Sequence, residues 1–523
     1  MKLKFFTSLI LLTVLVSSCT PLFSAKNEEA PNIEQKVSKL VEDWRQLSSV
    51  DTALIAIESP DLGKMVIISG GLTQGDPLEF SQDTPFSIYS INKTFIAAEI
   101  LSLEQDGTLS LNDPISKYLP TLPFSDEISI FNLLNHTSGY SDYIYGHEFQ
   151  LAVAGNLSRE WTIDESLSYL GKELLFFPGD QFHYSSANFT ILGRIIEAVT
   201  QKSLQDELNE RFFEPLGLDH TYVTQKGSPE EYLNGYHQCD RLPIEVQEYI
   251  DTSLGNLESC DDNLFAFTKI PHRAAESTDY EMISNLDNLI TWSKNLYSGN
   301  ILGPKQTTIM TTVIAESGYY GLGTMKKETP LGTFYGHTGG GFGQARMWYS
   351  PEMDLSIAGW VSLEGQPDFT WLTDKIFAML SGDEVVVPLN IKDQIVSLQN
   401  ENADVRIESA NQLGQMGEDA EDAIPALIDM MNSDPVSSAQ AAAARALSFI
   451  GQSSPSEKDL IFSALDEKLH GDLDIEVKKA IILAIGFIRH ENSQEILGPF
   501  LNNPNPEIAQ AANTAYQFAS GTP

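Results

Sequence analysis

Two kinds of hydrophobic spacing alternate along the first 381 residues of the chain. Apolar residues at helical spacing predict helices over residues 33–47, 282–296 and 369–380. Short runs rich in β-branched residues predict two strands over residues 53–58 and 65–69, joined by a Pro-Asp-Leu-Gly turn. Further strand-like runs cover residues 333–335, 344–349 and 355–362, and further helical runs cover residues 166–175 and 191–200. This part of the chain is therefore predicted to contain both helices and strands.

The run that follows Ser90 is apolar on nearly every side, which is typical of a helix buried on most of its surface. Ser90 is the only serine of the chain with a lysine, Lys93, three residues later. Residues at that spacing share one helix face, so the hydroxyl and the amine should lie side by side. A serine hydroxyl needs an adjacent base to act as a nucleophile, and apolar surroundings lower the pKa of a lysine. A chance pairing is the alternative, but a lysine inside such a helix is costly unless it has a partner.

The length of 523 residues predicts two or three domains. Acidic residues number 72 and basic residues 32, which gives a net charge of −40. Binding to nucleic acid needs a basic surface, so this charge argues strongly against nucleic acid as a partner. Such acidity favours solubility in salty surroundings.

The N-terminus has the features of a targeting segment. A short basic stretch precedes an apolar run over residues 5–16, which is too short to span a bilayer. The following Val-Ser-Ser-Cys sequence resembles the lipobox of bacterial lipoproteins, which implies cleavage before Cys19 and attachment of a lipid to it. A signal peptide with an incidental cysteine is the alternative. We expect a signal peptide over residues 1–19, a tether over residues 20–35 and a lipid-anchored protein in the cell envelope.

Two further cysteines, Cys239 and Cys260, leave two interpretations open. In an oxidising envelope they would pair and close a loop, and this is the interpretation we favour. Alternatively, each is a small buried hydrophobic residue. The sequence shows no cluster of His, Cys and Asp with the spacing of metal ligands, so we expect neither a metal nor another cofactor.

The character of the chain changes near residue 391, where aromatic residues become scarce and alanine becomes common. A short motif recurs there, and its copies begin at Leu413, Leu447 and Ile485, 34 and 38 residues apart. Self-similarity at this period indicates stacked helical hairpins, and the segment resembles an array of HEAT-like repeats. We therefore expect an all-α repeat domain over residues 391–523 that offers a docking surface to a protein partner. An ordinary alanine-rich helical domain is the alternative.

Two later motifs accompany Ser90 and Lys93 along the chain: Tyr184, and the triplet His337-Thr338-Gly339. This order resembles that of serine β-lactamases and penicillin-binding proteins, in particular the class C β-lactamase and DD-peptidase branch with its related esterases. The resemblance covers residues 37–381. It implies an α/β (α+β) fold of the β-lactamase/transpeptidase type, with an antiparallel sheet flanked by helices, over residues 36–385.

The resemblance also implies a role for each motif. Ser90 would attack a carbonyl and become acylated, while Lys93 and Tyr184 would share the proton transfers. The N–H groups of Ser90 and Gly340 would form the oxyanion hole. The remaining residues implied to bind substrate are Ser186, His337, Thr338 and Gly339, and His136 is expected to order a loop through hydrogen bonds. Ser186 stands where the family has an asparagine that holds the substrate amide, which favours ester cleavage over amide cleavage.

These observations predict an envelope serine hydrolase that acts on small amides or esters, such as a D-alanyl peptide or a β-lactam. The rival hypothesis is an inactive hydrolase fold that binds cell-wall fragments and uses the repeats to dock a protein. The intact set of Ser90, Lys93 and Tyr184 favours the enzyme, and Ser186 favours the rival. Two residues bear on how the carboxylate of a substrate would be held. Neutral histidine, as at His337, is a weak anchor for a carboxylate. Arg346 would either help to hold the carboxylate or, as we favour, be an exposed strand residue.

Overall fold

The structure is a computed structural model of the 523-residue chain. It describes residues 32–520, with the exception of 49, 72–80, 155–160, 225–232, 234–235, 239–263, 267–279, 342, 363–368, 384, 386–390 and 472. The predicted lipidation site Cys19 and the cysteines Cys239 and Cys260 lie outside the described residues, so these predictions stay open. Within the described part, no helix is both long enough and apolar enough to cross a membrane.

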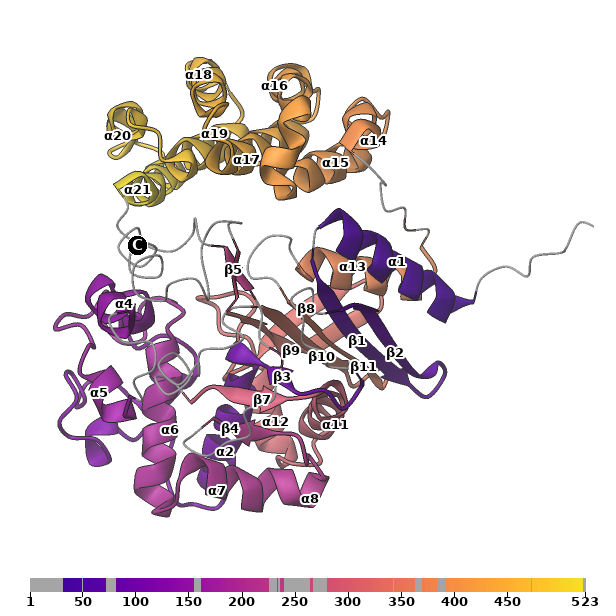
Figure 1. Ribbon diagram of the computed structural model, residues 1–523. Coiled ribbons are helices and arrows are strands. Elements are labelled where there is room, and N and C mark those ends of the chain that lie inside the picture. The colour runs from indigo at the N-terminus through magenta and orange to yellow at the C-terminus, as the bar shows by residue number, and fades with distance from the viewer. Residues whose placement is uncertain are drawn as a thin grey trace, which may run out of the picture.

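A six-stranded antiparallel sheet forms one half of the domain that precedes the repeats (Figure 1). Its strand order is β2-β1-β11-β10-β9-β8, so the hairpin from the beginning of the chain pairs with strands from residues 325–361. Strands β10 and β11 are buried along their whole length because helices cover both faces. The strands are β1 (Thr52–Ser59), β2 (Gly63–Gly70), β8 (Met325–Thr329), β9 (Gly332–Gly340), β10 (Gln344–Ser350) and β11 (Leu355–Val361).

Helices α1 (Ile33–Leu47) and α13 (Phe369–Leu380) cover one face of this sheet, and α11 (Leu286–Tyr297) lies against the other (Figure 1). Both α1 and α13 were predicted. The Asn32 side chain caps α1 in a capping box with Gln35, so the helix takes the last three residues of the predicted tether. This two-sided cover explains why the predicted strands read as continuous apolar runs.

Helix α2 (Asn92–Gln105) passes through the core of the second, mostly helical half. Every residue from Asn92 to Leu103 is buried, which confirms the prediction of a helix enclosed on most sides. A 3₁₀ turn, Tyr89–Ile91, introduces it. The elements around it are α3 (Ile130–Leu134), α4 (His147–Ala154), α5 (Ile163–Leu167), α6 (Ser186–Thr200), α7 (Leu204–Leu208), a π-helical turn (Asn209–Phe213), α8 (Glu214–Leu216) and α12 (Pro304–Thr311). Shorter 3₁₀ turns are Ile115–Lys117 and Tyr143–Tyr145, and short strands are β3 (Phe86–Ser87), β4 (Tyr222–Val223), β5 (Tyr236–Gln238), β6 (Leu264–Ala266) and β7 (Met282–Ser284).

Two predicted helices were wrong in their extent. The run 282–296 begins as strand β7, which pairs with β3 and β4, and Asn285 then caps α11. The run 166–175 holds only the end of α5, because its capping residue Thr162 starts the helix earlier and residues 168–175 form turns. In both segments a long-range backbone partner outweighed the local helical spacing, as shown by the Leu175 N–H, which donates to the Gly139 carbonyl at 2.8 Å.

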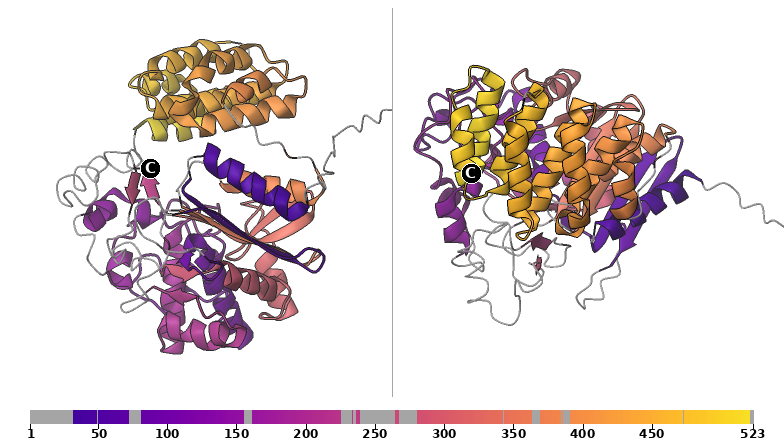
Figure 2. Two further views of the ribbon diagram at one scale, coloured as in Figure 1. Left: turned by 45° about the vertical axis from the view of Figure 1, so that its right-hand side comes forward. Right: turned by 90° about the horizontal axis from the view of Figure 1, so that it is seen from above.

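A helical array forms the C-terminal domain (Figure 2). Helices α15, α17, α19 and α21 pack side by side in chain order, and α16, α18 and α20 form an outer layer. Glycine is required where the inner helices touch, because a Cβ at Gly414 or Gly486 would collide with the backbone at Ala446 or Ala515. The elements are α14 (Ile391–Ser397), α15 (Ala403–Gln415), a 3₁₀ segment (Gly417–Ala423), α16 (Ile424–Ser433), α17 (Ser437–Ser453), α18 (Lys458–Leu469), α19 (Ile475–Ile488), α20 (Ser493–Leu497), a second 3₁₀ segment (Gly498–Phe500) and α21 (Pro506–Ser520).

A glutamate of the array contacts a helix of the preceding domain. Glu408 on α15 accepts a hydrogen bond from the Trp371 indole and lies 3.3 Å from the Lys375 ammonium. Both of these partners belong to α13, the helix that covers the outer face of the sheet. The two domains are therefore connected by side chains as well as by the linker between them (Figure 1).

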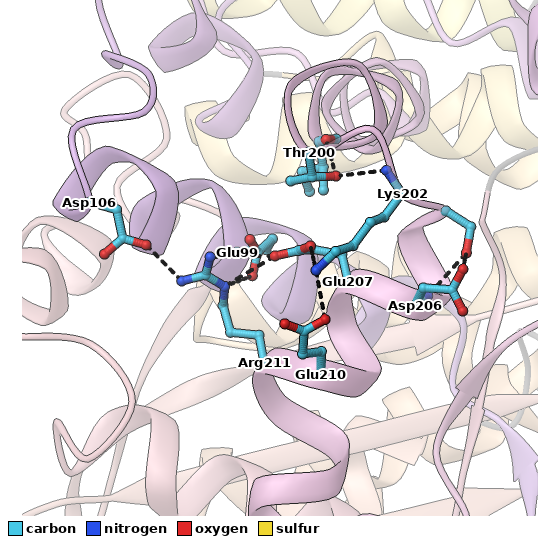
Figure 3. Close-up of polar contacts among 10 residues, drawn as sticks. Glu99, Asp106, Thr200, Lys202, Asp206, Glu207, Glu210 and Arg211 are labelled. Atoms are coloured by element: carbon cyan, nitrogen blue, oxygen red, sulfur yellow. Dashed lines mark hydrogen bonds and ion pairs between the residues drawn. The ribbon is translucent and has the colours of Figure 1, made fainter.

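A charged cluster closes the far end of α2 (Figure 3). The guanidinium of Arg211 lies 3.0 Å from Glu99, 2.9 Å from Asp106 and 3.4 Å from Glu207. Glu99 is fully buried, and this burial raises its pKa to about 8; Arg211 partly offsets the effect and Glu207 reinforces it. Lys202 extends the cluster to Glu207 and Glu210.

Candidate active site

Ser90 and Lys93 face each other across one turn at the start of α2. The Lys93 Nζ donates a hydrogen bond to the Ser90 Oγ at 3.1 Å. Lys93 is almost fully buried, whereas Ser90 remains partly exposed. The predicted pairing of the hydroxyl with the amine is confirmed, and it places a potential nucleophile beside a potential base.

Tyr184 brings its ring to this pair from the loop before α6. The Lys93 Nζ lies 5.4 Å from the centre of the Tyr184 ring, which is within the range of a cation–π contact. Another neighbour of the ring is His136, whose imidazole lies 4.2 Å away between ring centres at an angle of 31°. The three residues predicted to carry catalysis therefore lie together, although they come from two segments almost 100 residues apart.

The backbone just before Ser90 is strained and is held by a buried carboxylate. Tyr89 has a φ of +49°, an uncommon conformation for a residue with a side chain. The Glu281 carboxylate accepts the Tyr89 N–H at 2.9 Å and the Ser87 hydroxyl at 2.7 Å. Burial raises the pKa of Glu281, and these hydrogen bonds and Lys93 oppose the rise. Sequence reasoning missed Glu281, because it precedes a short strand and belongs to no motif.

A second carboxylate, Asp142, holds the start of α6. The Ser186 N–H donates to it at 2.7 Å. Burial raises the pKa of Asp142, and the hydrogen bond from the Ser186 N–H opposes the rise. The substrate-binding role expected of Ser186 stays a prediction. Asn188 does not replace the missing asparagine, because it is buried and bonded to other residues.

The strand that carries His337-Thr338-Gly339 packs against the turn that carries Ser90. Residues 338 to 340 of β9 pair with β10 on one side. A Cβ at Gly339 would collide with the Ile88 carbonyl, and one at Gly341 with the Tyr89 ring. The expectation that another backbone approaches these glycines is confirmed. Gly340 is exposed at the strand end, and the roles predicted for Gly340 and Thr338 stay predictions.

His337 differs from its predicted role of meeting the polar end of a substrate. Its ring is fully buried, with Nε2 3.0 Å from the Tyr320 hydroxyl and Nδ1 2.5 Å from the Thr338 carbonyl. Burial lowers the pKa of His337 to about 3, and Lys93 contributes to the shift. A neutral ring with both nitrogens engaged cannot anchor a carboxylate. Arg346 is also buried, contrary to expectation, and donates to the Gly339 carbonyl at 3.2 Å.

His136 is buried between the Tyr184 loop and Tyr320. Its Nδ1 accepts from the Ser185 N–H at 3.1 Å and from the Asn188 amide at 3.1 Å, and its Nε2 lies 3.2 Å from the Tyr320 hydroxyl. His136 therefore orders the Tyr184 loop, as its sequence context predicted. Tyr320 was missed, because it lies in an irregular segment with no helical or strand pattern. Among the described residues, no group of three or more His, Cys, Asp and Glu side chains could hold a metal ion.

The family model described as Beta-lactamase matches residues 63–376, which include Ser90, Tyr184, His337 and every strand of the six-stranded sheet except β1. The chain belongs to the beta-lactamase family. The model of HEAT repeats matches residues 394–448, so the predicted repeat array is confirmed over its first part. The predicted β-lactamase/transpeptidase fold is likewise confirmed.

Curated relatives in the beta-lactamase family resemble only part of this chain. Protein flp of Staphylococcus aureus (strain N315) is 30% identical over 219 residues, which cover 40% of this chain and 43% of that protein. Penicillin-binding protein 4* of Bacillus subtilis (strain 168) is 30% identical over 212 residues, or 38% of this chain and 46% of that protein. The chain thus spans less than half the length of the curated relatives that it matches.

Solved structures show the same fold over the hydrolase domain. A D-stereospecific amidohydrolase from Streptomyces sp. has a TM-score of 0.56 at 24% identity, covering 67% of this chain and 99% of that one. D-amino acid amidase from Ochrobactrum anthropi SV3, complexed with L-phenylalanine, has a TM-score of 0.56 at 23% identity, covering 66% and 98%. A penicillin-binding protein from Bacillus halodurans has a TM-score of 0.52 at 20% identity, covering 66% and 99%.

Proposed function

We propose that this protein is a serine hydrolase that cleaves small amides or esters through an acyl-enzyme on Ser90. The 3.1 Å contact between the Lys93 Nζ and the Ser90 Oγ, with the Tyr184 ring beside it, carries this proposal. Membership of the beta-lactamase family supports it. The buried carboxylate of Glu281 supports it further by holding the backbone that presents Ser90.

The arrangement suits acyl transfer in two steps. The Ser90 oxygen attacks the substrate carbonyl while its proton passes to the Lys93 and Tyr184 pair, and the leaving amine or alcohol takes that proton as its bond breaks. Water then attacks the acyl ester and restores Ser90. The N–H groups of Ser90 and Gly340 would hold the oxyanion, and losing one such donor typically costs about 10² to 10³ in rate.

The substrate class follows from what the site offers. The names of the structural relatives indicate amides of D-amino acids and penicillins, and a D-alanyl peptide or a β-lactam would have the same reacting group. Two observations shift the balance toward esters. Ser186 is bonded to Asp142 and offers no amide to the substrate, and His337 is neutral and offers no charge to a carboxylate.

We place the enzyme in the cell envelope, held by a lipid on Cys19, on the strength of the lipobox-like sequence around that residue. The repeat array would then offer a protein-binding surface on the same side of the membrane. Mass spectrometry of the protein purified from a bacterial host tests the anchor, because lipidation adds mass to a peptide that begins at Cys19. A mature protein that retains residues 1–18 contradicts it.

A binding protein without turnover is the second candidate. The observation that favours it is the serine at position 186, since the resemblance places an asparagine amide there to hold the substrate. Such a protein would bind cell-wall fragments beside Ser90 and a partner on the repeats. It would show no covalent adduct at Ser90.

Intact-mass measurement after exposure to fluorescent penicillin or a chromogenic ester tests the proposal. We expect an adduct or turnover with the wild-type protein and none with Ser90→Ala. Ser110→Ala is the matched control, because Ser110 is an exposed serine just beyond α2 and should change nothing. Absence of any Ser90-dependent adduct or turnover would leave only the binding role.

A further inference from the structure

A directional chain of hydrogen bonds runs beneath the candidate site. The Ser138 hydroxyl donates to the Asn188 carbonyl at 2.7 Å, which leaves the Asn188 amide to donate to His136 at 3.1 Å. The His136 Nδ1 also accepts the Ser185 N–H, so this nitrogen carries no proton. All of these groups are buried.

The proton positions follow from this start. A neutral His136 must carry its proton on Nε2, which donates to the Tyr320 oxygen at 3.2 Å. The Tyr320 hydroxyl then donates to the His337 Nε2 at 3.0 Å, and the His337 Nδ1–H donates to the Thr338 carbonyl at 2.5 Å. These tautomers are assigned from the network, and each donor in it meets one acceptor. We call His136, Tyr320 and His337 the imidazole–phenol relay.

The relay connects the two segments that form opposite sides of the site. One end binds the backbone of Ser185, the neighbour of Tyr184, and the other end is the first residue of the triplet that ends in Gly339. Only the Tyr320 hydroxyl can bridge the two rings, because it receives a proton from one and gives a proton to the other. Loss of this group would leave a buried donor and a buried acceptor without partners, which is costly.

We propose that Tyr320 is a positioning residue, whose hydroxyl fixes the tautomers of both histidines and thereby the spacing between Tyr184 and strand β9. The proposal rests on the proposed function for its catalytic consequence. With both imidazoles neutral, Lys93 is the cation beside Tyr184, and neither histidine adds a second positive charge there. Burial lowers the pKa of both histidines and raises that of Tyr320, which keeps all three rings neutral near pH 7. The ionisable groups that face the relay are Lys93, His183, Tyr184, Tyr297, Tyr319 and Arg346.

Nitrogen NMR of histidine-labelled protein tests the tautomers without any substitution. We expect His136 as the Nε2–H form and His337 as the less common Nδ1–H form, both unchanged between pH 5 and pH 8. A His337 signal of the Nε2–H form, or one that titrates in this range, overturns the proposal. This measurement decides the matter even if a substituted protein fails to fold.

Tyr320→Phe tests the positioning role, and Tyr319→Phe is its matched control. Tyr319 is the adjacent tyrosine, is partly exposed, and is not part of the relay. For Tyr320→Phe we expect kcat with a chromogenic ester to fall about 10- to 100-fold while KM changes little, because misplacement of reacting groups costs rate more than binding. We also expect each histidine of this variant to give a mixture of the Nδ1–H and Nε2–H forms, because the group that fixes the tautomers is gone.

Equal kcat values for folded Tyr320→Phe and Tyr319→Phe overturn the positioning role. The failure of the proposed function gives a different result: the wild-type protein then shows the expected tautomers but no turnover that depends on Ser90. The two proposals can therefore fail separately.

Discussion

Burial keeps several ionisable side chains neutral in this protein, and each affects stability with its own sign. Burial lowers the pKa of His136 and of His337. Below pH 6.5 the two histidines therefore bind protons in the unfolded chain but stay neutral in the folded protein. Their contribution is present above the ordinary value of 6.5 and is lost as the pH falls below it. Glu99 has the opposite effect on stability. Its pKa is raised to about 8, so its contribution to stability decreases as the pH rises.

The substitution Glu99→Gln should remove one cause of the decrease in unfolding free energy as the pH rises. The folded protein keeps Glu99 protonated up to about pH 8, whereas the unfolded chain releases that proton near 4.5. The wild-type protein should therefore lose up to about 1.4 kcal/mol per pH unit through this group between roughly pH 5 and pH 8. Urea unfolding at pH 5 and pH 9 measures this, and Glu104→Gln, on the same helix but less buried, is the control. Equal pH dependence in the wild-type protein and Glu99→Gln would disprove the assignment.

Glu281→Gln should slow acylation without unfolding the protein. The amide oxygen can still accept the Tyr89 N–H, but the negative charge that faces Lys93 is lost. Charge-assisted hydrogen bonds are about twice as strong as neutral ones, so we expect a five- to fiftyfold fall in kcat, on the order of 1–2 kcal/mol. Stopped-flow measurement of ester acylation gives the rate. A wild-type rate in this variant would show that Glu281 has only a structural role.

Sequence reasoning found the reacting residues but not the groups that support them. Ser90 and Lys93 were predictable because their spacing on one helix brings the two side chains together without any knowledge of the fold. Glu281, Asp142 and Tyr320 were not, because each reaches the site from a segment with no motif and acts through contacts distant in the sequence.

At the scale of elements, the loop before Tyr184 is held in place by backbone pairing. The N–H groups of Leu175, Gly179 and His183 donate to carbonyls in residues 136–139 at 2.8 to 2.9 Å. This pairing leaves Leu175 and Phe177 exposed at 54% and 75%. These residues form an apolar rim beside the Tyr184 loop.

Phe177→Ser should weaken binding of substrates with a large apolar group. Partial burial of an aromatic ring is worth about 1–2 kcal/mol, so KM for a long-chain ester should rise about five- to thirtyfold. The kinetics of an acetyl ester should stay the same, because its acyl group is too short to reach the rim. Met353→Ser, an exposed apolar position in the turn at the other end of β10, is the control. An equal rise in KM for both esters would contradict this role of the rim.

Element boundaries in the fold followed from sequence wherever the stabilising contacts were local. Helix α1 and helix α13 were predicted at their observed bounds, because their amphipathic spacing matches the face that they bury. The division of residues 282–296 into β7 and α11 could not be predicted, because the pairing of β7 depends on β3 and β4, which are far away in the sequence.

At the scale of the whole molecule, Glu408 connects the repeat array to helix α13 of the hydrolase domain. Glu408→Ala should loosen this contact, because removing a charge-assisted hydrogen bond costs about 1–2 kcal/mol, or about five- to thirtyfold in local opening. Amide exchange in α13 should rise by that factor. Glu401→Ala, an exposed glutamate just before α15, is the control. Unchanged exchange in α13 would show that the contact does not hold the domains together.

Within two turns, side chains of helix α13 bind the repeat array on one side and the sheet on the other. Trp371 and Lys375 hold Glu408 on the outside, and the adjacent Thr370 accepts a hydrogen bond from the Arg346 guanidinium at 3.1 Å on the inside. The same guanidinium donates to the Gly339 carbonyl, in the strand that borders the nucleophile. A protein that bends the repeat array when it binds would therefore displace the strand that borders Ser90. The fraction of the array that is bound and the rate of hydrolysis should then rise or fall together.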